Sequence, residues 1–318
     1  MLNFISYLEE TMEILTFNKL CNENKEDLYN FINNLDIDYN KSFEDMIKLF
    51  ESEVFNYGEN VFVIFEDGYI KGTISVITRE TKASGDVYIT DMYIAEDTLQ
   101  KNSKILSSLM SKAEEACDTP FTKRIILGIR NKIMYLSSCI ESYNFKYIHD
   151  ATIMKYDLDK ISQLENNIKV EFIPLTDENK DEFRTIHNEA FKGSPNAGAL
   201  SEEEVQDLIF QYKGNEDLVG IVKNNNNSVG IYMLANIDNE GWIDNIAILN
   251  RFRRNGIGKA IIKKSVEILK NRDIGVIKLL VISSNEAAHK LYTKYGFEEE
   301  LIFSKWFEKR VEKDINKI

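Results

Sequence analysis

Cysteine, histidine and proline are scarce in this chain of 318 residues, which contains three of each. Cys21, Cys117 and Cys139 all lie in the first half and form no CxxC pair. This pattern predicts a reducing compartment rather than a disulfide framework. Because the three histidines are not clustered, we also expect no bound metal.

Long apolar runs are also missing from the sequence. No run approaches the roughly 20 residues that are needed to span a bilayer, so we expect no association with membranes. The segment 1–10 carries two acidic residues and no basic ones, which is unlike a secretory signal peptide. Together these absences predict a cytoplasmic protein.

Basic residues are fewer than acidic ones. The chain has 39 Lys and Arg and 52 Asp and Glu, which gives a net charge of -13 at pH 7. An acidic surface repels phosphate backbones, so nucleic-acid binding is disfavoured. What the chain does have is length and apolar content. It is 43% hydrophobic and long enough for two domains of about 150 residues, each with a core of its own.

The pattern of apolar and turn residues indicates the same order of elements in both halves. In the first half we expect strands at 12–17, 61–65, 69–78, 87–95, 123–129 and 145–157, and helices at 24–35, 43–50, 104–117 and 132–142. In the second half we expect strands at 169–174, 217–223, 229–236, 242–249, 276–283 and 297–307, and helices at 202–212, 256–271 and 285–295. A further helix should follow the strand at 169–174, capped by Thr176 or Asp177.

Each half combines a strand meander with strand–helix–strand crossovers, which is typical of an α/β fold (α+β, with a mixed sheet) covered by helices. The four asparagines at 224–227 should form a hairpin turn, because Asn tolerates the left-handed conformation. The polar segment 158–167 interrupts the strand pattern between the halves. We therefore place the domains at 1–158 and 159–318.

The segment Arg253–Lys259, which reads RRNGIGK, follows a predicted strand and opens a predicted helix. A helix N-terminus carries unpaired N–H groups and a partial positive charge, so it binds phosphate well. Gly256 and Gly258 remove side chains that would hold the backbone away from a pyrophosphate. The sequence contains neither a P-loop nor a dinucleotide-binding GxGxxG. A basic patch surrounds the glycines, formed by Arg251, Arg253, Arg254 and Lys259.

A second segment, Asn285–Phe297, reads NEAAHKLYTKYGF. Asn285 can cap a helix that ends at Gly296 in a left-handed conformation. One face of this helix carries Ala288, Leu291, Tyr292 and Tyr295. Taken alone, the segment indicates an ordinary amphipathic helix with packed aromatic residues.

Together the two segments resemble the GNAT N-acetyltransferase superfamily. Its Q/R-x-x-G-x-G/A signature is matched by Arg253, Gly256 and Gly258. Its second signature, N-x-x-A-x-x-L/F-Y-x-x-x-G-F, is matched by Asn285, Ala288, Leu291, Tyr292, Gly296 and Phe297. The resemblance is strongest over 242–297, and the order of elements extends it over 169–307. It implies two tandem GNAT-type acyl-CoA N-acyltransferase folds, in a layout similar to that of mycothiol synthase.

The resemblance also implies acetyl-CoA as cosubstrate, held between splayed strands at 246–248 and 279–283. The implied binding residues are Ile246, Ala247 and Ile248 for the pantetheine and thioester, Asn285 for the pantetheine arm, and the N–H groups of Arg253, Arg254, Asn255, Gly256, Ile257, Gly258 and Lys259 for the pyrophosphate. The Tyr292 phenol is expected beside the CoA sulfur.

Attack of a neutral amine on a thioester develops an oxyanion and then a thiolate. A backbone N–H can stabilise the oxyanion, and the Tyr292 phenol can protonate the thiolate. Two bases are open, Asp244 on the central strand and Glu240 near its start, while the strand around Leu280 is apolar. No covalent nucleophile is needed, and no cysteine lies in the second half.

We therefore expect an N-acetyltransferase that moves an acetyl group to a primary amine of a small molecule or peptide. The alternative is a non-catalytic acetyl-CoA-binding sensor. The loop at 192–200 should frame the acceptor, but its composition does not indicate a particular substrate. The oligomeric state stays open.

The N-terminal repeat is predicted to be a degenerate copy. Its turn at 97–104 lacks both glycines and the arginine, and Asp97 would repel a phosphate. Ile140 stands where Tyr292 lies in the C-terminal repeat. Lys101 and Lys104 leave open a non-productive binding of CoA.

Overall fold

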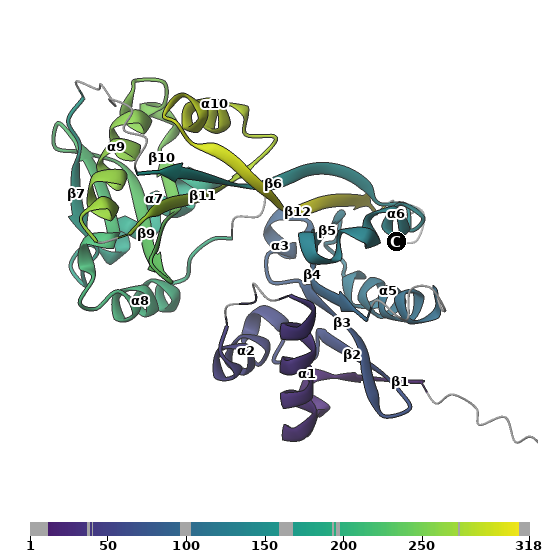
Figure 1. Cartoon of the computed structure of the whole chain (residues 1–318). Helices are drawn as coiled ribbons and strands as arrows, with labels where there is room; N and C mark the ends of the chain where they lie inside the picture. The colour runs from purple at the N-terminus through teal and green to yellow at the C-terminus, as the bar shows by residue number, and fades with distance from the viewer. Residues whose placement is uncertain are drawn as a thin grey trace, which may run out of the picture. The chain divides into compact units, whose positions relative to one another are not determined.

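The computed structural model describes residues 12–36, 39, 41–95, 103–158, 168–192, 194, 198–272 and 274–311. The chain divides into two compact units (Figure 1). The first unit consists of Met1–Asp150 with Phe303–Ile318, and the second consists of Ala151–Ile302. Each unit is a mixed sheet with helices, so the predicted α/β class with a mixed sheet is confirmed.

The sheet of the first unit runs in the order β1-β2-β3-β4-β5-β12. β4 and β5 pair in parallel, and the other neighbours pair antiparallel. The strands are β1 (Met12–Thr16), β2 (Val61–Glu66), β3 (Tyr69–Ile77), β4 (Asp86–Ile94), β5 (Arg124–Arg130) and β12 (Glu298–Arg310). The helices are α1 (Asn22–Leu35), α2 (Phe43–Phe50), α3 (Thr81–Ser84), α5 (Ser103–Cys117) and α6 (Ser137–Glu141).

The sheet of the second unit runs in the order β7-β8-β9-β10-β11-β6, with β10 and β11 in parallel. The strands are β6 (Lys146–Asp157), β7 (Glu171–Pro174), β8 (Val219–Asn224), β9 (Asn227–Ile237), β10 (Glu240–Ile248) and β11 (Val276–Ile282). The helices are α7 (Lys180–Phe191), α8 (Glu202–Gln211), α9 (Ile257–Lys270) and α10 (Glu286–Lys294). The order matches that of the first unit strand for strand, which confirms the predicted internal repeat.

The last strand of each repeat belongs to the sheet of the other unit. Residues Ala151–Asp157 of β6 pair antiparallel with β11, although β6 follows α6 in the chain. Conversely, residues Ser304–Arg310 of β12 pair antiparallel with β5. The compact units therefore do not follow the division between 158 and 159 that we expected from the sequence. Residues 159–167 of the expected linker lie outside the described residues.

Apolar cores position the two sheets against their helices. In the first unit Phe17, Phe50 and Ile74 are fully buried. In the second unit α9 packs on one face of the sheet, and α7 and α8 pack on the other. Helix α9 buries Ile257 and Ile261, which are four residues apart and therefore share one helix face. Each buried side chain of this size contributes about 1.5–3 kcal/mol.

Local sequence signals account for several turns and fail at two helices. Asn225 and Asn226 adopt left-handed φ angles of 49° and 64°, which confirms the predicted hairpin turn. The predicted cap of α7 is wrong, because the helix begins at Lys180, after its N-cap Asn179. The Asn179 side chain instead accepts the N–H of Thr176 at 2.9 Å. The predicted helix at 132–142 is a 3-10 turn followed by α6, since the backbone is not helical at Ile133.

Candidate active site

The two parallel strands of the second unit separate part-way along their length. β10 pairs with β11 over Glu240–Ile243 only. A bulge at Asp244 follows, after which Asn245–Ile248 pair with β9 alone. One edge of Asn245–Ile248 therefore presents backbone N–H and C=O groups that no described strand pairs. The predicted splay is confirmed, and Ile246, Ala247 and Ile248 lie along it.

Helix α9 begins against the end of β10. A Cβ atom built on Gly258 would lie 3.4 Å from the Ile248 side chain and 3.4 Å from that of Leu291. In the part of the chain that the structure describes, no acceptor is found for the N–H groups of Ile257, Gly258 and Lys259. No side chain caps the helix, and its first turn carries no acidic residue. Such a helix terminus attracts anions.

Gly256 and Gly258 are glycines for different structural reasons. Gly256 has a φ of 76°, where residues with a side chain are strained, so the backbone turn into α9 requires glycine. Gly258 is inside the helix, and a Cβ atom there would make only ordinary contacts. Protein packing therefore does not explain the second glycine, whereas close approach of a ligand to the backbone does.

Arg253 has structural partners, which corrects its predicted place in a free basic patch. Its Nε donates to the carbonyl of Ile248 at 2.8 Å, and its Nη2 donates to that of Ala190 at 3.0 Å. The backbone N–H of Arg253 is also used, because it donates to Asn250 at 3.2 Å. Arg253 therefore ties the end of β10 to the end of α7.

The other cations of the predicted patch differ from one another. Arg251 forms a salt bridge with Glu189 at 2.6 Å. Arg254 and Lys259 have no side-chain partner among the described residues, and Arg254 is exposed. Arg254 and Lys259 thus carry the positive charge that remains available at the start of α9.

Tyr292 lies on α10, on the face that packs against the core of the second unit. Its ring centroid is 5.9 Å from that of Phe297, and the side chain is half-buried. Burial raises the pKa of the phenol to about 12. The phenol is therefore protonated at neutral pH, as a proton donor must be. Ala288, Leu291 and Tyr295 pack on the same face, as predicted.

Asn285 caps α10. Its Oδ1 accepts the N–H of Ala288 at 3.2 Å, which confirms the predicted cap. The helix is followed by Gly296 with a left-handed φ of 89°, also as predicted. The predicted contact between Asn285 and the pantetheine arm stays a prediction.

The two carboxylates considered as bases have different surroundings. Glu240 forms a salt bridge with Lys278 at 2.8 Å, at the start of β10 where the strands are still paired. Asp244 lies at the bulge, where the gap between the strands opens. The Asp244 side chain reaches solvent, but protein atoms crowd its other sides, and this desolvation raises the pKa of its carboxyl. Asp244 is therefore the better placed of the two.

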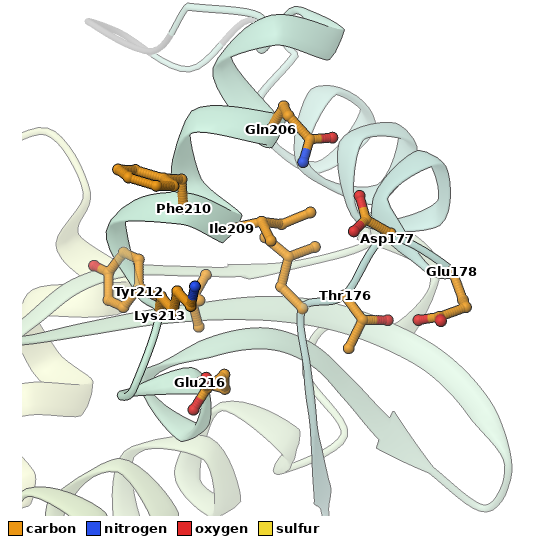
Figure 2. Close-up of a pocket in the computed structure, with 11 residues that line it drawn as sticks. Thr176, Asp177, Glu178, Gln206, Ile209, Phe210, Tyr212, Lys213 and Glu216 are labelled. Atoms are coloured by element: carbon orange, nitrogen blue, oxygen red, sulfur yellow. The ribbon is translucent and has the colours of Figure 1, made fainter.

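A pocket of about 350 Å³ in the same unit was not predicted from the sequence (Figure 2). It is formed by residues after β7, by the end of α8 and by residues before β8. Tyr212 lines the pocket, and burial and the charge of Asp244 raise the pKa of its phenol to about 12. The charge of Asp244 therefore acts on one of the residues that line the pocket. Charged side chains around the pocket are Asp177, Glu178, Lys213 and Glu216.

The first unit has the same separation of strands, but the Tyr135 side chain reaches across it. β4 pairs with β5 over Asp86–Ile89 only. Beyond that point the Tyr135 hydroxyl, which follows β5, donates to the carbonyl of Ile94 at the end of β4 at 3.1 Å. Ile140, at the position of Tyr292, is fully buried. Most of the turn at 97–104 lies outside the described residues, so its lack of a phosphate site stays a prediction.

Two further properties concern the described residues as a whole. They contain no group of three or more His, Cys, Asp or Glu side chains that could hold a metal ion. None of the helices formed by these residues has the length and apolar character needed to cross a membrane.

Comparison with known families agrees with this geometry. The family model described as "Acetyltransferase (GNAT) family" matches residues 180–297. The match begins with α7 and runs to the end of α10, so it contains the bulge, the gap and the start of α9. Residues 180–297 are thus similar to the GNAT acetyltransferase family.

Individual relatives and solved structures agree with this match. An uncharacterised N-acetyltransferase of Methanocaldococcus jannaschii is 25% identical over 172 residues, which cover 51% of this chain and 72% of that protein. A GCN5-related N-acetyltransferase structure from Sphaerobacter thermophilus, 15% identical, covers 96% of this chain and 97% of its own, with a TM-score of 0.71. A tandem GNAT protein from the clavulanic acid biosynthesis pathway, 9% identical, covers 96% and 100%, with a TM-score of 0.63. These structures show the fold, and the predicted tandem GNAT architecture is confirmed.

Proposed function

We propose that the second unit transfers the acetyl group of acetyl-CoA to a primary amine of a small molecule or peptide. The observation that supports this most directly is the gap between β10 and β11, which opens at Asp244 and extends to Ile248 at the start of α9. A strand edge whose N–H and C=O groups pair with no neighbouring strand suits the amide-bearing arm of CoA, and only the Ile248 carbonyl is already bound, by Arg253 Nε. An uncapped helix terminus suits its pyrophosphate.

Two parts of the site would hold the cosubstrate. The free edge of Asn245–Ile248 would bind the pantetheine amides and orient the thioester. The N–H groups of Ile257, Gly258 and Lys259 would bind the pyrophosphate, with the Arg254 guanidinium beside them. Gly258 would let the pyrophosphate approach the helix backbone. Acetyl-CoA itself supplies the activated acetyl group.

Proton transfer would be shared between Asp244 and Tyr292. An amine is protonated in solution and attacks the thioester only after it loses a proton. The Asp244 carboxylate would accept that proton directly or through water, and its raised pKa makes it a stronger base than an ordinary aspartate. The Tyr292 phenol would protonate the CoA sulfur as the carbon–sulfur bond breaks. A backbone N–H beyond the bulge would stabilise the oxyanion that forms on the carbonyl.

The acceptor amine would approach from the side of β10 on which Asp244 and Tyr212 lie. The pocket that Tyr212 lines carries three carboxylates and one ammonium group around it (Figure 2). Excess negative charge favours a cationic ligand, and an amine acceptor is a cation before it loses its proton. This charge balance supports an amine acceptor over an acidic one.

The proposal is tested by measuring acetyl-CoA binding and acetyl transfer separately. Calorimetry should show one acetyl-CoA site per chain, and thiol release should depend on an added amine from a panel of polyamines, amino sugars and lysine-containing peptides. Binding without thiol release from any amine would favour the sensor. Absence of acetyl-CoA binding would contradict both readings.

A further inference from the structure

An apolar side chain is exposed beside the gap in the sheet of the second unit. Leu280 of β11 is 43% exposed, and it directly follows Leu279, the last residue of β11 that pairs with β10. Asp244 directly follows Ile243, the last residue of β10 in the same pairing. Because the two strands are parallel, Leu280 and Asp244 begin the two sides of the gap. An acceptor whose amine lies at Asp244 would therefore have Leu280 across the gap from it.

Leu280 lies on the face of the sheet that α9 does not cover. Leu279 and Val281 are buried in the core that includes the apolar face of α9. Side chains alternate between the two faces along a strand, so Leu280 points to the opposite face. Lys278 also lies on that face, and it forms a salt bridge with Glu240 of β10 at 2.8 Å. This face therefore continues from β11 to β10, the strand that carries Asp244.

Two more apolar side chains extend this surface onto the neighbouring strands. Ile153 of β6 lies directly opposite Leu280 and is buried. Trp242 of β10 lies opposite Lys278, two residues before Leu280, and is half-buried. Cross-strand neighbours point to the same face, and diagonal neighbours are within reach of large side chains. Trp242, Leu280 and Ile153 thus form an apolar strip across three strands at the start of the gap.

The first unit fills the corresponding position with one of its own side chains. Leu127 is the last residue of β5 that pairs with β4, so Gly128 corresponds to Leu280. Trp306 of β12 lies opposite Gly128 and covers it, because a Cβ atom built on Gly128 would lie only 2.9 Å from the Trp306 ring. The exposed apolar side chain beside the gap is therefore a property of the second unit's own sequence and is not required by the fold.

We propose that the apolar strip selects an acceptor whose primary amine is attached to an apolar alkyl or aryl group, an inference that rests on the acetyl transfer proposed above. With the amine at Asp244, the apolar group would cover Leu280 and Trp242, and its removal from water would favour binding. A polyamine or an amino sugar would instead place ammonium or hydroxyl groups against Leu280 and Trp242, which accept no hydrogen bond.

The acceptor class is tested by measuring kcat/KM with acetyl-CoA for n-propylamine, n-pentylamine and 4-amino-1-butanol, which is similar in length to n-pentylamine. Thiol release gives the rate, and the three ammonium groups have similar pKa values. The value for n-pentylamine should exceed that for n-propylamine at least fivefold, because each methylene removed from water contributes up to about fourfold. 4-Amino-1-butanol should lose most of this gain. Equal values for all three amines would overturn the inference and leave the proposed function standing, whereas thiol release with no amine would overturn both.

The role of Leu280 is tested by the ratio of kcat/KM for n-pentylamine to that for n-propylamine, because the ratio cancels any common effect on acetyl-CoA. Leu280→Thr keeps a strand-forming residue and removes most of the apolar surface, so the ratio should fall at least threefold. Leu280→Met should keep the ratio.

Leu301→Thr is the matched control for Leu280→Thr and should leave the ratio unchanged. Leu301 of β12 is 36% exposed. The preceding residue, Glu300, forms a salt bridge with Lys278 at 3.2 Å and so shares the face of Leu280, which places Leu301 on the other face. An unchanged ratio in Leu280→Thr, or an equal fall in Leu301→Thr, would contradict the proposal.

Discussion

The two units part their parallel strands at the same place and differ in what lies beyond it. In the second unit the edge of Asn245–Ile248 is left open, and a helix terminus without an acidic residue lies against its end. In the first unit Tyr135 crosses from the end of β5 to the carbonyl of Ile94. The same backbone therefore supports an open gap in one unit and a bridged one in the other.

The comparison separates what the fold provides from what the sequence adds. The splay and the bulge recur in both units, so they belong to the fold. The proposed proton donor does not recur, because Ile140 replaces Tyr292 and is buried in the core. The proposed catalysis would therefore rest on a few side chains and on the start of one helix.

The largest effect is expected from Tyr292→Phe, which makes the second unit resemble the first in lacking a proton donor. The change keeps the ring packing and removes the hydroxyl, so kcat should fall about 10²–10⁴-fold while acetyl-CoA still binds. Steady-state kinetics and calorimetry measure the two quantities. Tyr135→Phe in the first unit is the matched control and should leave kcat unchanged. A near-normal kcat in Tyr292→Phe would make that residue a core aromatic only.

A smaller loss, of about 10²-fold in kcat, is expected from Asp244→Asn, since water can partly replace the base. The active form is the carboxylate, and its pKa is raised. The rate difference between the unaltered chain and the variant should therefore shrink as the pH falls through that raised pKa, at a higher pH than the ordinary aspartate value of about 3.9. A ratio of the two rates that does not change with pH would contradict the role as base.

Variants of the two glycines test whether the start of α9, which distinguishes the second unit, binds acetyl-CoA. Gly258→Val places a branched side chain where the pyrophosphate is proposed to approach, so the Kd for acetyl-CoA should rise at least tenfold. Gly258→Ala adds one methyl group with ordinary contacts and fits the family signature, so it is the matched control. Gly256→Ala should instead lower the melting temperature, because φ is 76° there. An unchanged Kd in a folded Gly258→Val variant would remove the pyrophosphate from this position.

The smallest effect is expected from the arginines. Arg254→Gln should weaken acetyl-CoA binding by no more than about fivefold, because an exposed charge contributes about 0.2–1 kcal/mol. Added salt should reduce the difference. Arg253→Gln should instead lower the free energy of unfolding by about 1 kcal/mol, since its guanidinium binds two backbone carbonyls. Equal effects of the two variants on affinity and stability would show that the arginines do not differ in role.

Much of the fold was predictable because local signals decide it. The start of α9 follows from the glycines and from apolar residues four apart, and the end of α10 follows from Gly296. The partners of Arg253 were not predictable, because the carbonyl of Ala190 is distant in sequence and any arginine near a phosphate motif suggests a ligand. The burial of Thr73 and Ser75 was also not predictable, because polar residues in a strand do not indicate which face of the sheet is buried.

The partners of the last strands were also beyond sequence reasoning. β6 and β12 carry the alternating pattern of a strand, and that pattern is the same whichever sheet the strand joins. The predicted boundary therefore followed the order of the chain. A fragment that ends at Leu158 would leave the edge of β5 without β12, so it would not be a fair test of the first unit alone.

The exchange of strands also sets an order of events during synthesis of the chain. The first unit is translated first, but the edge of β5 stays unpaired until Ser304–Arg310 have been made. An unpaired strand edge can pair with other chains, so the growing polypeptide is prone to aggregation through most of its synthesis. The second unit finds β6 already present when β11 emerges. The half of the molecule that the ribosome makes first is thus the half that it completes last.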